Sequence, residues 1–166
     1  GGRGRRMAND LATELRPLML DDLGLNAAID WLAHGWAARM GIAVKLQLGR
    51  SDPNISDAAA IALFRMVQEA LTNIARHANA SEVRIQIRHS RGTLLLTIQD
   101  NGMGFAEASM YREGSHGLMG IRERAYMLGG TLEIGNARGG GGRIAVRLPL
   151  RAADDALRTP EEQDRR

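Results

Sequence analysis

The order in which helical and strand periodicities follow one another most constrains the fold of this chain. Helical spacing of apolar residues runs from Leu20 to Met40, from a Ser56 N-cap to about Ala78, and over Leu118–Leu128. Alternation typical of half-buried strands occupies 42–48, 82–89, 93–99, 131–134 and 144–148. This order, with one hairpin in its middle, predicts an α/β two-layer sandwich in which helices cover one face of a mixed sheet.

Composition places the chain among ordinary globular domains. It has 166 residues, of which 44% are hydrophobic and 25% charged, so we expect a single core. The longest apolar run, 58–64, is far shorter than the ~20 residues of a membrane-spanning helix. The chain has no cysteine, which excludes disulfides and thiolate chemistry and favours a cytoplasmic location.

Basic residues do not predict a nucleic-acid partner. The formal net charge is +3, and Lys45 is the only lysine among 22 basic residues. The remaining positive charges are scattered arginines with few aromatic residues between them, unlike a nucleic-acid-binding surface.

Familiar nucleotide and metal motifs are missing. Lys45 has no P-loop neighbours, and the pair Gly102 and Gly104 lacks the third glycine of a dinucleotide fingerprint. The four histidines show no zinc-binding spacing. The sequence therefore excludes those common sites.

A polar stripe follows the longest predicted helix. Glu69, Asn73 and His77 recur every four residues with Arg76 beside them, turned away from the predicted core face. The plain alternative is the solvated side of an amphipathic helix. Asparagine is a poor mid-helix residue, however, and its amide oxygen suits Mg²⁺ together with phosphate oxygens and waters. The stripe is thus a candidate metal–phosphate site.

Two glycine-rich segments follow. In the segment 100–105, a carboxylate at a strand end could accept a hydrogen bond from an adenine amino group, while glycines allow close approach of the backbone. A type I′ hairpin turn is the alternative. In the segment 114–120, glycines precede a helix N-terminus that could bind phosphate, the alternative being a flexible connector.

In their order and spacing these stretches resemble the GHKL ATPases. "QEALTNIARHANA" resembles their N box, "DNGMGF" the first glycine box, and "GSHGLMGIRERA" the second, lid-bearing one. "LGGTLEIGNARGGGGRIAVRLPL" is similar to the closing strands and the third glycine segment. Upstream, "LRPLMLDDLGLNAAIDWL" resembles the junction before the catalytic domain in bacterial sensor histidine kinases that work with NarL/LuxR-type response regulators. The resemblance covers Leu15 to Leu150.

The resemblance implies a Bergerat-type fold that binds ATP and Mg²⁺ between the long helix and the glycine loops. It implies that Asn73 coordinates Mg²⁺ and that Glu69 positions or deprotonates the attacking group or holds a metal-bound water. By the same resemblance, Arg76 lies near the phosphates and His77 is a neighbour of the nucleotide.

For the glycine boxes, the resemblance implies that Asp100 recognises the adenine amino group and that Gly102 and Gly104 shape its pocket. The lid would depend on three residues around the start of the last helix: Gly117, Leu118 and Gly120. Positioning and charge neutralisation are most of what phosphoryl transfer requires.

Two departures from the family pattern stand out. Arg143 occupies the place of the usual threonine in the third glycine segment, which puts that contact in doubt. None of the four histidines is followed by aspartate, so the phosphoacceptor expected in an upstream helix is missing. We therefore expect ATP–Mg²⁺ binding with little kinase activity from this chain alone.

The expected organisation has three parts: 1–19 as a remnant of the dimerisation helix and linker, 20–150 as the catalytic domain, and 151–166 as a charged tail. The full-length protein would be a homodimer, with an inner-membrane anchor left open, and the fragment a monomer or weak dimer. Two alternatives to a histidine kinase are a nucleotide-gated interaction module and a serine kinase of the anti-sigma-factor type.

Overall fold

A computed structural model of the chain describes residues 20–105 and 116–150. The flanking parts expected at 1–19 and 151–166 lie outside the described residues, as does most of the predicted lid, 106–115. In chain order, the helices and strands are α2 (Leu25–Met40), β1 (Ala43–Gln47), α3 (Asp57–His77), β2 (Glu82–Ser90), β3 (Thr93–Asp100), α4 (His116–Met127), β4 (Thr131–Asn136) and β5 (Gly142–Pro149).

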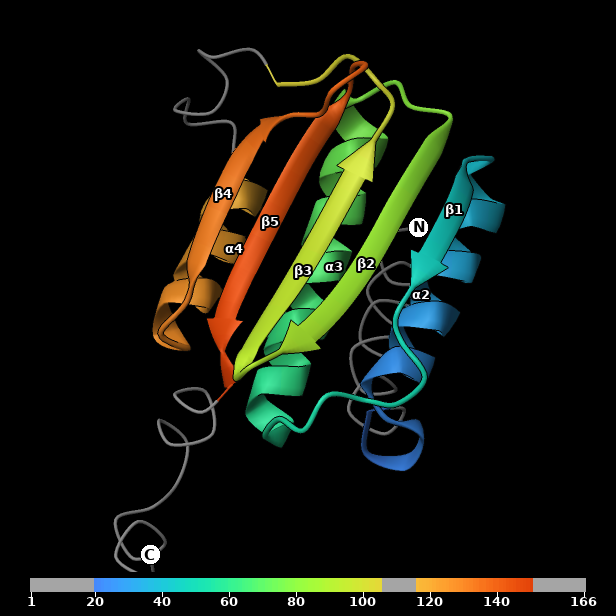
Figure 1. Cartoon of the computed structure of the whole chain (residues 1–166). Helices are drawn as coiled ribbons and strands as arrows, with labels where there is room; N and C mark the ends of the chain where they lie inside the picture. The colour runs from blue at the N-terminus through green and yellow to red at the C-terminus, as the bar shows by residue number, and fades with distance from the viewer. Residues whose placement is uncertain (1–19, 106–115, 151–166) are drawn as a thin grey trace, which may run out of the picture.

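The five strands form one sheet in the order β1-β2-β3-β5-β4. β1 runs parallel to β2, and the other neighbours are antiparallel. Figure 1 shows α2, α3 and α4 side by side on the same face of this sheet. The predicted mixed sheet with helices on one face, an α/β two-layer sandwich, is confirmed.

Strand alternation decides which face is covered. On β2 and β3 every second residue is buried beneath the helices, and these residues are Val83, Ile85, Ile87, Leu94, Leu96 and Ile98. They pack against α3, whose fully buried side chains include Leu63, Phe64 and Met66. The residues between them on β2 are polar and face the open side of the sheet.

Local signals set most boundaries where the sequence predicts them. The Ser56 hydroxyl accepts a hydrogen bond from the Ala59 N–H at 3.1 Å and caps α3. Arg91 and Gly92, with φ of 52° and 76°, form a two-residue turn of type I′ character between β2 and β3. The predicted hairpin is therefore confirmed.

The helix expected from Leu20 is interrupted. Residues 20–23 are helical, but Gly24 leaves the helix and α2 begins at Leu25 without a side-chain cap of its own. Instead the Oδ1 atom of Asp52, in the loop before α3, accepts a hydrogen bond from the Asn26 N–H at 2.8 Å. Gly24 has a φ of 85°, and the side chain that bonds the first turn of α2 comes from 26 positions away, so helical periodicity alone does not predict the break.

Within the described part of the chain, no helix combines the length and the apolar character needed to cross a bilayer.

Candidate functional site

A hollow opens where α3, the end of β3, the start of α4 and the start of β5 meet. Its apolar lining is interrupted by Asn73 and Asp100, from two of the predicted stretches, and by Arg143. The full lining is Ala70, Asn73, Ile74, Ile98, Asp100, Phe105, Leu118, Gly142, Arg143 and Ile144. Its lining of apolar residues with a few convergent polar groups is typical of a small-molecule site. The hollow itself is small, about 10 Å³, so its walls would have to move apart to admit a nucleotide.

Asp100 is the buried acid of this hollow, with only 6% of its surface exposed. Its Oδ1 atom accepts hydrogen bonds from the Gly102 N–H at 2.8 Å and the Gly142 N–H at 3.2 Å. Among the described residues, no hydrogen bond reaches its Oδ2 atom. The carboxylate is thus held in place through one oxygen. The other oxygen can accept a hydrogen bond from a donor such as the amino group of a nucleobase.

Gly102 joins the end of α3 to the loop after β3. The Met103 N–H donates to the Ala78 carbonyl at 2.8 Å, and a Cβ atom at Gly102 would overlap that same oxygen. Only glycine allows the backbone this close. The segment after Asp100 therefore runs past the end of α3, and the next element along the chain is α4, not a strand. The alternative of a type I′ hairpin turn here is wrong.

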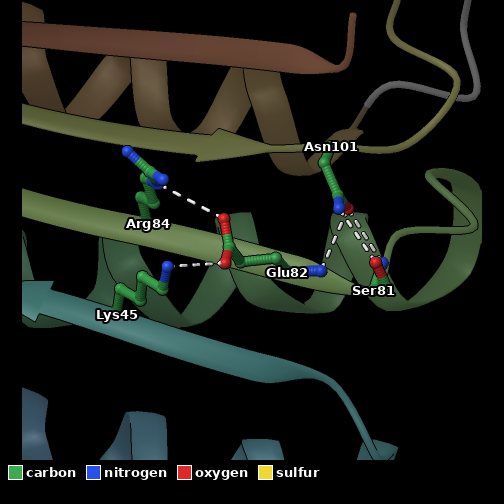
Figure 2. A network of polar contacts seen from close by, with 5 residues as sticks. All are labelled: Lys45, Ser81, Glu82, Arg84 and Asn101. Carbon is green, nitrogen blue, oxygen red and sulfur yellow. Dashed lines mark hydrogen bonds and ion pairs between the residues drawn. The ribbon is translucent and has the colours of Figure 1, made fainter.

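Figure 2 shows a polar network in which Asn101, the residue after Asp100, contacts the start of β2, while Lys45 and Arg84 contact Glu82. The Asn101 Oδ1 atom accepts from the Ser81 and Glu82 N–H groups, each at 2.9 Å, and its Nδ2 donates to the Ser81 hydroxyl at 2.8 Å. Hydrogen bonds from Lys45, which has the larger effect, and from Arg84 lower the pKa of the Glu82 carboxyl below its ordinary value of 4.5. The hydrogen bonds of Asn101 fix the residue next to Asp100 to the start of β2.

The predicted stripe on α3 is only partly brought to the hollow. Asn73 lines it and is half-buried, and Glu69 lies one turn earlier, also half-buried, outside the lining. Arg76 and His77 are exposed and outside the lining. The stripe therefore contributes one direct wall residue.

The residues predicted for the lid lie in the first turns of α4. Leu118 is 5% exposed and lines the hollow. Gly117 belongs to the first turn of the helix, and Gly120 follows in the next, half-buried. The preceding Gly114 and Ser115 lie outside the described residues.

The oxygen donors near the hollow fit a hard cation that brings other ligands with it. Asn73 offers an amide oxygen and Glu69 a carboxylate from the same helix face. Over 20–105 and 116–150 there is no group of three or more His, Cys, Asp or Glu side chains that could form a closed metal cage. This set suits Mg²⁺, which takes few protein ligands and completes its shell with phosphate oxygens and water.

Sequence reasoning missed three contributors. Gly142 donates to Asp100, Phe105 forms a wall, and Asn136 bonds the backbone of Phe105. The glycine run 139–142 is visible in the sequence, and Phe105 stands within the first glycine box. Nothing in a single sequence indicates that Asn136 reaches a residue 31 positions away.

The family of the chain follows from comparison with known proteins. The sequence profile described as histidine kinase-, DNA gyrase B-, and HSP90-like ATPase matches residues 58–152, more than half of the chain. The chain belongs to this family of ATPases.

Individual relatives narrow the class. The signal transduction histidine-protein kinase/phosphatase DegS of Brevibacillus brevis is 36% identical over 137 residues, which are 82% of this chain and 35% of that protein. The histidine kinase domain of the Erythrobacter litoralis EL346 blue-light activated histidine kinase is 25% identical with a TM-score of 0.70, covering 80% of this chain and 64% of that one.

The ATP-binding domain of PrrB from Mycobacterium tuberculosis is 30% identical with a TM-score of 0.57, covering 74% of this chain and 90% of that one. Fold, family and these likenesses define an ATP-binding domain of the histidine-kinase type. The chain spans about a third of the length of the curated relatives it matches.

Proposed function

We propose that residues 20–150 are the ATP–Mg²⁺-binding catalytic domain of a sensor histidine kinase. The intact enzyme transfers the γ-phosphoryl group of ATP to a histidine of its dimerisation domain, which lies outside this chain. The group then passes to an aspartate of a NarL/LuxR-type response regulator. The observation that carries the proposal is the fixed Asp100 carboxylate, which shares one hollow with Asn73.

Asp100 and Asn73 serve different parts of the nucleotide. The Oδ2 atom of Asp100 accepts a hydrogen bond from the adenine amino group, while the apolar lining receives the ring. Asn73 would offer its amide oxygen to Mg²⁺, and Glu69 would position the attacking group, take its proton or hold a water bound to the metal. When bound, Mg²⁺ neutralises charge that develops on the phosphates.

The remaining predicted residues surround this centre. Arg76 and His77, at the exposed end of the stripe, lie toward the phosphates and the nucleotide edge. The backbone at Gly102 and Gly104 shapes the adenine pocket. Three residues at the start of α4 support a lid over the triphosphate, namely Gly117, Leu118 and Gly120.

The partners follow from this role. Because none of the four histidines precedes an aspartate, the chain alone binds ATP without efficient self-phosphorylation and is a monomer or weak dimer, whereas the full-length protein is a homodimer. Both ATP and the response regulator place the domain in the cytoplasm. No nucleic acid is involved.

Calorimetric titration with ATP and Mg²⁺ tests the proposal through Asp100→Asn. An asparagine keeps the Oδ1 acceptor for Gly102 and Gly142 but puts an NH₂ donor where Oδ2 faces the adenine amino group. We expect affinity to fall about 100-fold or more, since two donors then meet in a buried site. The exposed Asp30 on α2 supplies the control, because Asp30→Asn also removes one negative charge and should leave Kd unchanged.

Asn73→Asp tests the metal side in the same titration and should alter the Mg²⁺ dependence of binding without abolishing adenosine binding. Failure of the wild-type chain to bind millimolar ATP, or equal binding by Asp100→Asn, would refute the proposal. ATP binding without transfer to an added dimerisation domain would favour the nucleotide-gated interaction module.

A further inference from the structure

Asn136, the last residue of β4, bonds the backbone of Phe105 in both directions. The Phe105 N–H donates to the Asn136 Oδ1 atom at 2.7 Å, and the Asn136 Nδ2 atom donates to the Phe105 carbonyl at 3.0 Å. The side-chain amide therefore supplies one acceptor and one donor to a single residue, as a neighbouring strand would. We call this pair of bonds the Asn136 clamp.

The clamp acts on a wall of the hollow. Phe105 is one of the lining residues, and its ring packs so closely on Gly142 that a Cβ atom there would lie 2.7 Å from Phe105 Cε2. In the β4–β5 ladder, Gly142 is the register partner of Asn136. The same end of this hairpin thus touches both the ring and the backbone of Phe105.

Gly104 makes room for the clamp. Its φ of 77° is a left-handed conformation that favours glycine, and a Cβ atom on it would lie 2.7 Å from the Asn136 Oδ1 atom. A side chain at 104 would therefore push the amide away from Phe105. This contact explains why glycine is required at position 104, a predicted site residue.

Both ends of the segment 100–105 are held by one hairpin. At the first end, the Gly142 N–H donates to Asp100 at 3.2 Å. At the other end, the Asn136 clamp holds Phe105. Loss of the clamp would free the Phe105 wall while leaving the Asp100 carboxylate bonded.

We propose that Asn136 is a positioning residue for nucleotide binding, which holds the Phe105 wall at the correct distance from the Asp100 carboxylate. This inference rests on the proposed ATP-binding function and deepens it, since it assigns a residue to the adenine side of the site. Asn136 acts through Phe105 and does not itself line the hollow.

Asn136→Ala is tested with adenosine and with ATP–Mg²⁺ by calorimetry, at a temperature where all variants are folded. Losing two hydrogen bonds should weaken both ligands alike, by about tenfold, because the adenine wall is common to both. The matched control is Asn26→Ala. The Asn26 amide also bonds two backbone carbonyls, those of Leu48 and Ser51, but at the α2 end of the molecule. The Asn26→Ala variant should therefore have a lower melting temperature and unchanged Kd values for both ligands.

Amide exchange of Phe105, followed by NMR without ligand, reports the clamp directly. Asn136→Ala should remove protection of the Phe105 N–H, whereas Asn136→Asp keeps an acceptor for it and should retain protection. Unchanged Kd values in Asn136→Ala, or an equal loss in Asn26→Ala, would overturn the inference while the wild-type chain still binds ATP. A wild-type chain that binds neither ligand would overturn the proposed function and the inference together.

Discussion

At the scale of single residues, Gly102 lies so close to the carbonyl of Ala78 that a Cβ atom on it would overlap that oxygen. Gly102→Ala would place a methyl group inside that contact, and neither the helix end nor the loop can move freely, because the Met103 N–H bonds the same oxygen. We expect the free energy of unfolding to fall by about 2–3 kcal/mol, measured by urea denaturation.

Gly135 provides the matched control for this prediction. It lies in β4, and a Cβ atom there would meet nothing within 4 Å. Gly135→Ala should therefore be neutral or slightly stabilising, because alanine loses less conformational entropy on folding. Equal stabilities for the two alanine variants would show that the approach at Gly102 is not required.

Residue spacing predicts some of the residues that line the hollow but not how far the hollow extends. Asn73, on a helix face defined by a four-residue spacing, and Asp100, at a strand end, both line the hollow. Glu69, Arg76 and His77 share that helix face and still lie outside the lining. The hollow covers only part of the stripe, and its extent depends on how α4 and β5 pack, which spacing along α3 does not specify.

At the scale of elements, the parallel pair β1–β2 carries a pH-sensitive contact. Glu82 on β2 pairs with Lys45 on β1 at 3.0 Å and with Arg84 at 3.3 Å, and both contacts lower the pKa of its carboxyl below 4.5. A depressed folded-state pKa means that the ionised form stabilises the native state. That stability is fully present above the unfolded-state value and is lost as the pH falls through the folded-state pKa.

Glu82→Gln isolates this contribution. The difference in urea midpoint between the wild type and Glu82→Gln should be largest near pH 7 and should shrink as the pH drops below 4.5. It should also shrink in high salt, because the pair lies at the surface. A difference that stays constant from pH 7 to pH 3 would mean that Glu82 acts only through packing.

Element identity is far more predictable here than element boundaries. The five strands alternate clearly and Ser56 is a standard cap, so the strands and α3 are predicted nearly as they occur. The break at Gly24 is not, because its cap is the distant Asp52. Periodicity specifies which face of an element is buried, whereas a contact between remote loops leaves no local pattern.

At the scale of the whole molecule, the proposed site joins elements that the sheet order brings together from distant parts of the chain. β5, which comes last among the strands of the described residues, inserts between β3 and β4, and this places Gly142 beside Asp100. α3 and α4 cover that part of the sheet, while α2 and β1 lie toward the other edge (Figure 1). A ligand in the hollow would thus contact α3, α4, β3 and β5 but not α2 or β1.

Hydrogen exchange with and without ATP–Mg²⁺ should distinguish the elements that line the hollow from α2 and β1. A ligand at 100 times its Kd stabilises the folded state by roughly 2.7 kcal/mol against global unfolding, but amides that exchange by local opening gain protection only where the ligand restrains the opening. We therefore expect added protection at the C-terminal half of α3, the end of β3, the start of α4 and Gly142, with little at exposed amides of α2 and β1. Protection concentrated on α2 and β1 instead would place the nucleotide elsewhere, because neither element contributes a residue to the hollow.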